Sequence, residues 1–272
     1  MKNILACTDF SSSGNNAAHY AAGLAKAAET KLILFHVCHL PVATGEVPIM
    51  AYDVAEIEKI ALERLKKEAE GINKVFGIET AVEVTTGLLT DEVKDAAKKN
   101  EAGLVVMGTR GEGNAVGIFG GAAHEVIHRC GLPVLAIPGG ATWRPFKKIV
   151  FASDLHKDEH PQYDILRRFA NMNNAKVLLV SMLHKNETPS MEKAVAGVRL
   201  EHDFEGMRHE MLLLENDDTI EGLNKFVEEE NADLLVVLPH RHNIFKRLFG
   251  TTHTQKMLRH AHLPLLALPE TV

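Results

Sequence analysis

The sequence predicts an α/β protein made of two tandem domains, each a parallel, doubly wound sheet with helices on both faces. Short, uninterrupted apolar runs rich in Val, Ile and Leu are typical of strands that are buried on both faces. Segments with helical periodicity lie between these runs, and such alternation specifies a parallel sheet with right-handed crossover connections. The same series of segments occurs twice along the chain.

The duplication rests on four pairs of similar segments that follow one another in the same order. These pairs are NILACTDF (3–10) with KIVFASDL (148–155), KLILFHVCH (31–39) with KVLLVSMLH (176–184), AGLVVMG (102–108) with ADLLVVL (232–238), and LPVLAIP (132–138) with LPLLALP (263–269). Ordered repetition predicts a first domain over residues 1–141 and a second, diverged domain over 142–272. The break falls in PGGATWRPFKK at 138–148, where Gly and Pro interrupt the pattern as a linker does.

In the first copy, five strands are expected, at 3–8, 31–37, 81–87, 104–107 and 133–137. An Ala-rich segment after Ser and Gly predicts a helix over 15–29, and apolar residues at helical spacing predict another over 54–76. Thr90, followed by two acids, marks the start of a third helix, because acids stabilise the positive end of a helix dipole. A fourth helix is expected over 121–130.

The second copy repeats this series in a diverged form. Its elements are expected at 148–153, 159–173, 176–182, 190–201, 210–215, 218–230, 234–238, 253–260 and 264–268, with strands and helices alternating. The helix at 190–201 is shorter than its counterpart at 54–76, which accounts for most of the residues that the second copy lacks.

The composition is that of a globular protein and argues against several classes of partner and framework. Among 272 residues, 46% are hydrophobic and 24% are charged, which is typical of globular domains. A net charge of −6 argues against a nucleic-acid or anionic-membrane partner, and three cysteines argue against a disulfide framework. No segment is typical of a signal peptide or a membrane-spanning helix, so a cytoplasmic protein is expected.

Candidate binding residues follow the expected strands of the first copy. In open parallel sheets, ligands bind beyond the carboxyl ends of the strands. Asp9 follows the first strand, Gly108 and Gly111 follow the fourth, and Gly120 and Gly121 lead into the last helix. Glycines let a backbone approach a phosphate, and a helix N-terminus adds positive potential. The alternative is structural, with the glycines serving tight turns and Asp9 capping the first helix.

These residues resemble the universal stress protein family. ILACTDFS near the start, FHV at 35–37, VVMGTRG after the fourth strand and the final CGLPVLAIP are similar to that family, whose nucleotide-binding members carry Gly-x2-Gly-x9-Gly followed by Ser or Thr. The resemblance covers nearly the whole chain, twice. It implies tandem flavodoxin-like (adenine nucleotide alpha hydrolase-like) domains of five parallel strands each, packed as an intramolecular pseudo-dimer. It also implies an adenine nucleotide such as ATP, ADP or AMP, bound for regulation rather than catalysis.

The resemblance assigns nucleotide-binding positions in the first copy. Asp9 matches the acid that contacts the adenosine portion, and Val37 matches a position whose backbone meets adenine. The remaining positions, in the loop after the fourth strand and in the phosphate turn, are Met107, Gly108, Arg110, Gly111, Gly120, Gly121 and Ala122.

The phosphate turn departs from the family pattern. If the sequence is aligned with the family at Pro133, Gly120 takes the place of the third glycine of the pattern. If nine residues are kept between the second and third glycines, Gly121 takes that place instead. Gly121 or Ala122 then stands where Ser or Thr is expected, so the hydroxyl is missing in both registers. Loss of one charge-assisted hydrogen bond weakens affinity by about ten- to a hundredfold.

The second copy departs further. Pro239 and His242 stand near the glycine positions, and proline has no N–H to offer a phosphate. The candidates for ligand contact in this copy are Asp154, His240, His242, Thr251 and Thr252. Family-type nucleotide binding is therefore expected mainly in the first copy.

Fifteen histidines raise the question of a metal site. His124 and His128 are spaced i, i+4, and His36 and His39 flank Cys38, yet the sequence contains neither HExxH nor paired CxxC. Surface or hydrogen-bonded histidines are the simpler interpretation, so no metal is predicted. A metal site assembled across the two copies is the alternative.

Three functions are compatible with these features: a nucleotide-binding stress regulator, an enzyme acting on nucleotides, and a scaffold or a metal- or small-molecule-binding protein that acts through protein contacts. Neither a P-loop nor a general base is identifiable, so an enzyme is not predicted, while weak ATP hydrolysis stays open. A protein partner of unknown identity is expected. Pairing of VLAIP with LLALP would satisfy the edge strands within the chain, and dimerisation of the whole chain stays open.

Overall fold

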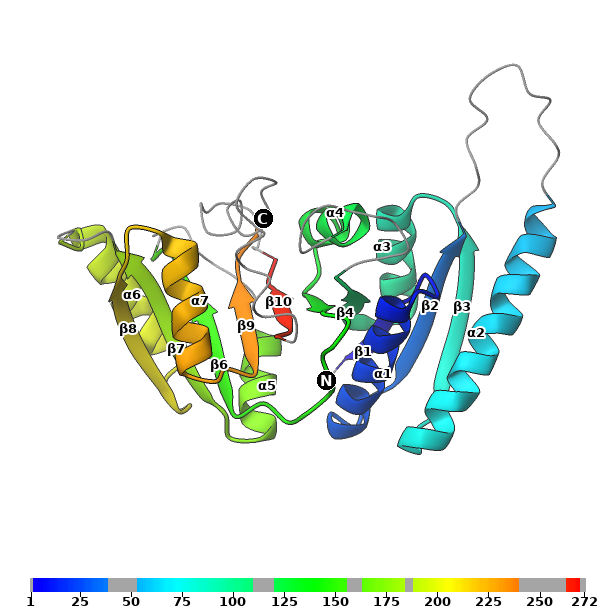
Figure 1. Cartoon of the computed structure of the whole chain (residues 1–272), viewed down its shortest axis with the longest axis horizontal. Coiled ribbons are helices and arrows are strands. Elements are labelled where there is room, and N and C mark those ends of the chain that lie inside the picture. Colours follow the sequence, from blue (N-terminus) through cyan, green and yellow to red (C-terminus); the bar gives the residue numbers. More distant parts are fainter. Residues whose placement is uncertain are drawn as a thin grey trace, which may run out of the picture.

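The strands of both copies join in a single ten-stranded sheet with helices on its two faces (Figure 1). The computed structural model describes residues 2–38, 53–109, 120–155, 163–183, 188–239 and 263–269. Over these residues the strands are β1 (Asn3–Cys7), β2 (Leu32–Cys38), β3 (Thr80–Thr86), β4 (Ala102–Gly108), β5 (Val134–Ile137), β6 (Lys148–Ala152), β7 (Lys176–Leu183), β8 (His209–Glu215), β9 (Leu234–Val237) and β10 (Leu265–Ala267). The helices are α1 (Ser12–Ala27), α2 (Val54–Phe76), α3 (Leu89–Lys99), α4 (Gly121–Arg129), α5 (Asp164–Met172), α6 (Met191–Asp203) and α7 (Thr219–Glu229). The predicted tandem α/β fold is confirmed.

The strand order is β3-β2-β1-β4-β5-β10-β9-β6-β7-β8, and neighbouring strands within each copy are parallel. The exception is the pairing of β5 with β10, which is antiparallel and sets Leu135 opposite Leu266. The last strands of the two copies therefore pair with each other inside one chain. This pairing covers the strand edge that each copy would expose if it stood alone.

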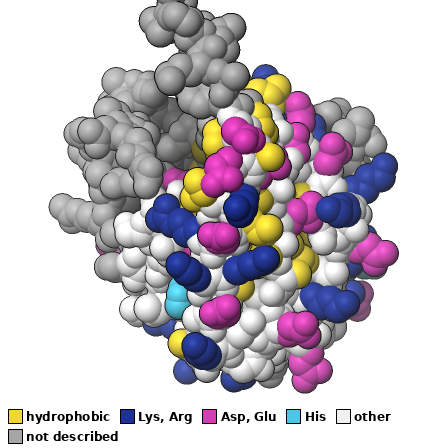
Figure 2. Space-filling model, turned by 90° about the vertical axis from the view of Figure 1, so that its right-hand side faces the viewer, with side chains coloured by type: hydrophobic (Ala, Val, Ile, Leu, Met, Phe, Trp, Pro, Cys, Tyr) yellow, Lys and Arg dark blue, Asp and Glu magenta, His cyan; other side chains and the backbone are white. Residues whose placement is uncertain are grey.

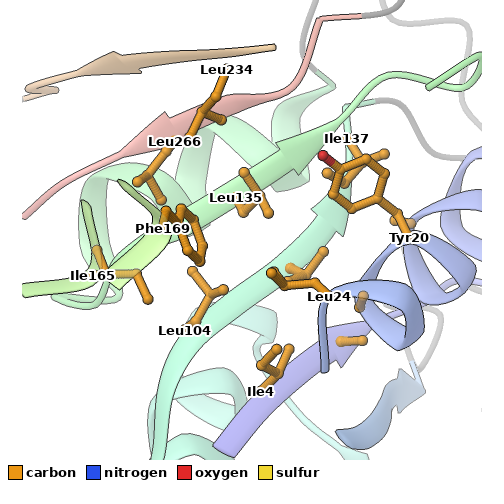
Figure 3. Packing of buried hydrophobic residues seen from close by; sticks show 14 of the residues in the cluster. Ile4, Tyr20, Leu24, Leu104, Leu135, Ile137, Ile165, Phe169, Leu234 and Leu266 are labelled. Carbon is orange, nitrogen blue, oxygen red and sulfur yellow. The ribbon is translucent and has the colours of Figure 1, made fainter. Parts of the chain in front are cut away.

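Successive side chains of each strand point to opposite faces of the sheet, so the apolar core consists of two layers. Ile4 of β1 packs in the layer covered by α1, α2, α5 and α6, whereas its neighbour Leu5 packs in the layer covered by α3, α4 and α7. Figure 3 shows the first layer passing from Leu104 of the first copy to Phe169 of the second, with Leu135 beside Phe169. The two copies thus share one continuous apolar core.

Capping residues explain where the helices begin. Ser11 caps α1 by accepting a hydrogen bond from the N–H of Gly14 at 3.0 Å, so α1 starts at Ser12, three residues earlier than expected. Asp53 caps α2, which has 23 residues, whereas α6 has 13, as expected for a shortened helix. The helix expected at 253–260 and the first residues of that expected at 159–173 lie outside the described part of the chain. No helix among the described residues is both long enough and apolar enough to cross a membrane.

The linker between β5 and β6 is held on the first copy by α1. Asn16 Nδ2 donates hydrogen bonds to the carbonyl oxygens of Pro138 and Ala141, at 3.0 and 2.9 Å. Trp143 lies so close to Gly23 that a β-carbon on Gly23 would be 2.3 Å from the indole Cδ1 atom. Glycine at position 23 is therefore required for the linker to pack against the helix.

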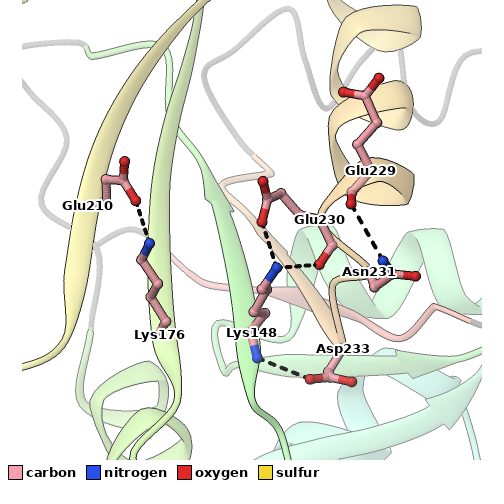
Figure 4. A network of polar contacts seen from close by, with 7 residues as sticks. All are labelled: Lys148, Lys176, Glu210, Glu229, Glu230, Asn231 and Asp233. Atoms are coloured by element: carbon pink, nitrogen blue, oxygen red, sulfur yellow. Dashed lines mark hydrogen bonds and ion pairs between the residues drawn. The ribbon is translucent and has the colours of Figure 1, made fainter.

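On the second copy, the linker is held by Asp233. The backbone N–H groups of Lys147 and Lys148 donate to Asp233 Oδ2 at 2.8 and 3.0 Å, and Arg144 Nη2 lies 3.0 Å from Oδ1. Lys148 Nζ also donates to the carbonyl oxygen and the carboxylate of Glu230 (Figure 4). The charges around this joint are paired with one another, which indicates a structural role.

Candidate functional site

A cavity of about 350 Å³ lies at the carboxyl ends of β1, β2 and β4, beside the start of α4. Its lining residues are Cys7, Thr8, Asp9, Gly14, Phe35, His36, Val37, Leu89, Met107, Gly108, Thr109, Gly120, Ala122 and Ala123. Six of the positions assigned by resemblance line this cavity, namely Asp9, Val37, Met107, Gly108, Gly120 and Ala122. Gly121 is not part of the lining, and Arg110 and Gly111 lie outside the described residues.

Asp9 is held at the mouth of the cavity by Ser11. Its Oδ1 atom accepts hydrogen bonds from the Ser11 N–H at 3.0 Å and from the Ser11 hydroxyl at 2.5 Å. Ser11, rather than Asp9, is the N-cap of α1, so the alternative of Asp9 as the helix cap is wrong. The Asp9 carboxylate is fixed in place and exposed, as a group that contacts a ligand must be.

The turn that carries Asp9 has an unusual backbone. Phe10, the next residue, has φ of 64°, and its N–H donates to the Thr8 hydroxyl at 3.0 Å. The Phe10 ring contacts His36 in a tilted arrangement, with ring centroids 4.4 Å apart, and the Arg64 guanidinium lies over the ring, 4.2 Å from its centroid. These contacts hold a non-glycine residue in the left-handed region, which single residues enter at a cost of roughly 1–2 kcal/mol.

His36 is a further residue of the cavity lining. Its Nδ1 atom is 2.8 Å from the Thr8 carbonyl oxygen, so Nδ1 carries the proton and donates to that carbonyl. This bond ties the end of β2 to the Asp9 turn. The expectation of a hydrogen-bonded structural histidine therefore agrees with the contacts of His36.

The N-terminus of α4 forms another part of the lining. Gly120 is its N-cap and offers no side-chain hydrogen bond to the first turn. The Gly120 N–H donates to the Thr109 carbonyl at 2.7 Å, which fixes the helix start against the end of β4. Ala122 and Ala123 of the first turn line the cavity, so the positive end of the helix dipole faces it.

Two glycines of the lining are needed for close approach. A β-carbon on Gly14 would be 2.6 Å from Asp9 Oδ1, and a β-carbon on Gly108 would be 2.6 Å from the Ser13 hydroxyl and 2.9 Å from the Ser13 carbonyl oxygen. Gly108 therefore lets the end of β4 pass against α1. At Gly108, the alternative of a structural role for glycine therefore agrees with the packing, and the same residue also lines the cavity.

The cysteines do not behave as nucleophiles. Cys7 lines the cavity but is buried, and burial, with a smaller contribution from Cys130, raises the pKa of its thiol from 9.0 to about 12. Burial also raises the pKa of the Cys130 and Cys38 thiols. All three thiols are protonated at neutral pH, and a protonated thiol is a poor nucleophile.

The second copy preserves the turn after its first strand. The N–H of Leu155 donates to the Ser153 hydroxyl at 3.0 Å, and Leu155 has φ of 54°, matching Phe10. Asp154 therefore occupies the place of Asp9. The other candidates of this copy, His240, His242, Thr251 and Thr252, lie outside the described residues.

The described histidines, cysteines and acids form no group of three or more that could hold a metal ion. His124 and His128 do lie together on α4, with ring centroids 4.4 Å apart.

The sequence did not point to every residue of the lining. Gly14 was visible in SSSGNN, but its contact with Asp9 depends on how α1 turns back from the end of β1. Leu89 is the first residue of α3 and also lines the cavity. Its sequence context is that of any helix start, so it did not indicate a ligand contact. Such contacts arise from tertiary packing and leave no local pattern.

Comparison with known proteins identifies the family. The sequence model of the Universal stress protein family matches residues 1–138 and again residues 145–269. The universal stress protein MJ0531 of Methanocaldococcus jannaschii is 30% identical over 143 residues, which cover 50% of this chain and 81% of that protein.

Solved structures share the fold of the whole chain. A universal stress protein from Archaeoglobus fulgidus DSM 4304 matches with a TM-score of 0.71 and 16% identity, covering 98% of this chain and 96% of that one. A functionally unknown protein, PA1789 from Pseudomonas aeruginosa PAO1, matches with a TM-score of 0.55 and 14% identity, covering 99% and 93%. Because one family matches both halves, the chain belongs to the universal stress protein family, as a tandem member with two copies of its domain.

Proposed function

We propose that the first copy binds an adenine nucleotide, ATP, ADP or AMP, and that the protein acts as a stress-response regulator rather than as an enzyme. The observation that carries the proposal is the cavity between Asp9 and the N-terminus of α4. These two features are more than 100 residues apart in sequence, and they supply a carboxylate and a positive helix end to the lining of one cavity.

The carboxylate end suits a ribose. A carboxylate accepts hydrogen bonds from sugar hydroxyls, and Ser11 restrains the Asp9 side chain before any ligand arrives. Val37, Phe35 and Met107 add apolar surface beside it, which suits a flat base. The family resemblance assigns the same parts of the nucleotide to Asp9 and Val37.

The α4 end suits a phosphate. Its first turn has no side-chain cap, and backbone N–H groups at a helix N-terminus bind anions. Gly120 and Ala122 lie in the lining and Gly121 does not, so each register places one of its two positions at the cavity. A hydroxyl is absent from both positions, so affinity is expected to be modest.

The experiment starts with full-length protein. The purified chain is denatured, any released small molecule is identified by mass spectrometry, and ATP and AMP are then titrated calorimetrically. We expect micromolar to sub-millimolar binding of one nucleotide per chain. Asp9→Ala should weaken binding by more than about tenfold, because the ribose loses a charge-assisted partner.

Asp154→Ala is the matched control, because Asp154 occupies the corresponding turn of the second copy. It should leave nucleotide affinity unchanged. Loss of binding in Asp154→Ala with retention in Asp9→Ala would place the nucleotide in the second copy and overturn the assignment. Unchanged affinity in both variants would contradict binding through either acid.

The second candidate function is a scaffold that acts through protein contacts and has lost its ligand, or that takes a metal or another small molecule. The observation that favours it is the missing hydroxyl at Gly121 and Ala122. Millimolar or weaker nucleotide binding, with nothing released on denaturation, would favour this candidate. Phosphate release from ATP above background, lost in Asp9→Ala, would instead indicate an enzyme.

A further inference from the structure

One side of the turn that carries Asp9 is held from α2 by Arg64. The Nη2 atom of Arg64 donates to the carbonyl oxygen of Phe10 at 3.3 Å, and the guanidinium lies over the Phe10 ring. Glu68 stands four residues further along α2, so its side chain leaves the helix on the same face as Arg64. A second charged group of the same helix is therefore directed toward this turn.

The other side of the turn is held by the side-chain amide of Asn15, on α1. One atom of this amide lies 3.2 Å from the Thr8 hydroxyl oxygen and 3.2 and 3.3 Å from the two carboxylate oxygens of Glu68. The Thr8 hydroxyl also accepts a hydrogen bond from the Phe10 N–H at 3.0 Å. A chain of polar contacts thus runs from Glu68 through Asn15 into the turn itself.

The charge on Glu68 decides which atom of the Asn15 amide takes this place. An ionised carboxylate only accepts, so the amide nitrogen faces it and donates both to Glu68 and to the Thr8 hydroxyl. A protonated carboxyl carries a donor, so the amide oxygen can face it, and the Thr8 hydroxyl then donates to that oxygen. Thr8 therefore accepts from Asn15 in one state and donates to it in the other.

We propose that Glu68 is a positioning residue, and that its proton sets the hydrogen-bonding role of Thr8, which lines the cavity. While Glu68 is ionised, the Thr8 hydroxyl does not donate to Asn15 and can donate to a bound ligand. When Glu68 takes up a proton, the same hydroxyl donates to Asn15 instead. The effect on a ligand rests on the proposed function, whereas the contacts from Glu68 to the turn do not depend on it.

The environment of Glu68 suits a group that takes up a proton. Figure 2 shows charged side chains of both signs spread over the end of the molecule formed by α2 and β3, whereas Glu68 is partly buried where α2 meets α1. Burial raises the pKa of its carboxyl above the ordinary value for glutamate, and the Arg64 guanidinium lowers that pKa by a smaller amount. As the pH falls, Glu68 therefore binds its proton before an exposed glutamate does.

Other titratable groups belong to the elements around Glu68. They are His19, one turn after Asn15 on α1, Asp9 in the turn, and His36 on β2. Among the described residues, Arg64 is the charged group that shifts the pKa of Glu68. Because the histidines also bind protons, the test has to observe Glu68 itself.

NMR titration of the full chain tests this coupling without any nucleotide. As the pH falls, the carboxyl carbon of Glu68 should titrate at a pKa above the ordinary glutamate value, and the Asn15 side-chain amide and the Phe10 backbone amide should shift with the same midpoint. Glu68→Gln should remove this step from both amides. Glu70→Gln is the matched control, because Glu70 is exposed on the same helix, and it should leave the step in place.

Asn15→Ala separates the bridge from the charge. In this variant Glu68 still titrates, whereas the Phe10 amide should no longer follow it. The Leu155 amide, in the same turn of the second copy, is an internal control that no variant should affect. A Phe10 amide that follows Glu68 in Asn15→Ala, or a step that survives in Glu68→Gln, would overturn the role of Glu68. Thermal unfolding of each variant verifies that it is folded.

Calorimetric titration with adenosine measures the consequence for a ligand, because adenosine has no phosphate that changes charge over the same pH interval. In the wild type its Kd should rise by about three- to tenfold as Glu68 takes up its proton, since Thr8 no longer donates to the ligand. Glu68→Gln should lose this pH dependence, and a dependence that survives would overturn the effect on binding. If the wild type binds neither adenosine nor ATP, the proposed function fails, and the NMR titration still decides the role of Glu68.

Discussion

The β-carbon position of Gly14 faces the carboxylate of Asp9: a methyl group there would lie 2.6 Å from Asp9 Oδ1. Gly14→Ala should therefore displace the carboxylate from Ser11 and weaken nucleotide binding by about tenfold or more. Alanine is favoured over glycine in a helix by about 1 kcal/mol, and this gain offsets the cost of the displaced carboxylate. The free energy of unfolding should therefore change little. Calorimetric titration with ATP measures the effect. Gly71→Ala on α2, where no atom lies within 4 Å, is the control and should bind as the wild type does.

A hydroxyl at position 122 should improve binding. Ala122 lies in the first turn of α4 and lines the cavity, so Ala122→Ser supplies the side-chain hydrogen bond that the turn lacks. We expect ATP affinity to rise by about tenfold, with a smaller gain for adenosine, which has no phosphate. Gly121→Ser places the same group on the neighbouring residue, which is outside the lining. A larger gain for Gly121→Ser would show that the phosphate turn follows the shorter register.

Enlarging Gly23 should loosen the joint between the copies. A side chain there overlaps the indole of Trp143, which also packs edge-on against Tyr20 and Phe146, with ring centroids 5.3 Å away in each case. Gly23→Leu is expected to reduce the free energy of unfolding by about 2 kcal/mol, measured by urea denaturation. In Trp143→Ala the clash disappears, so Gly23→Leu should destabilise that background less. Equal losses in both backgrounds would show that Trp143 is not the obstacle.

Alkaline pH should destabilise the fold through Cys7. Burial raises the pKa of this thiol to about 12 from 9.0, so the folded state retains a proton that the unfolded state releases. Stability from this group is complete below pH 9 and is lost as the pH rises from 9 toward 12. The loss between pH 8 and pH 10 is about 1.4 kcal/mol. Cys7→Ala should show a shallower decline in unfolding free energy over that interval, and an identical decline would contradict the assignment to Cys7.

Most of the fold could be predicted because its determinants are local. Apolar runs such as ILAC and LVVM are too short for typical helices and therefore predict buried strands, and the repeat provides each element twice. The start of α4 followed from Gly120 and Gly121. The start of α1 did not, because Ser11 competes with two further serines as the cap and only the hydrogen bond to Gly14 distinguishes it.

The candidate site was predictable at its strand ends and less so between them. Parallel strands bring Asp9, Val37 and Gly108 to one edge by topology alone. The contacts of the Phe10 ring with His36 and Arg64 could not be foreseen, because Arg64 lies midway along α2 among many similar charges. Its contact depends on the angle at which α2 crosses the sheet, which sequence periodicity does not specify.

The antiparallel pairing of β5 with β10 has an evolutionary consequence. Two identical single-copy subunits joined through this strand would carry identical sites, so any substitution would appear in both. When both copies lie in one chain, a substitution in one copy does not alter the other. The two copies still pair one to one, because they are covalently linked. A proline, Pro239, can thus stand near a glycine position of the second half, and apolar residues can be exposed on α6, with Asp9 and Gly108 unchanged in the first half.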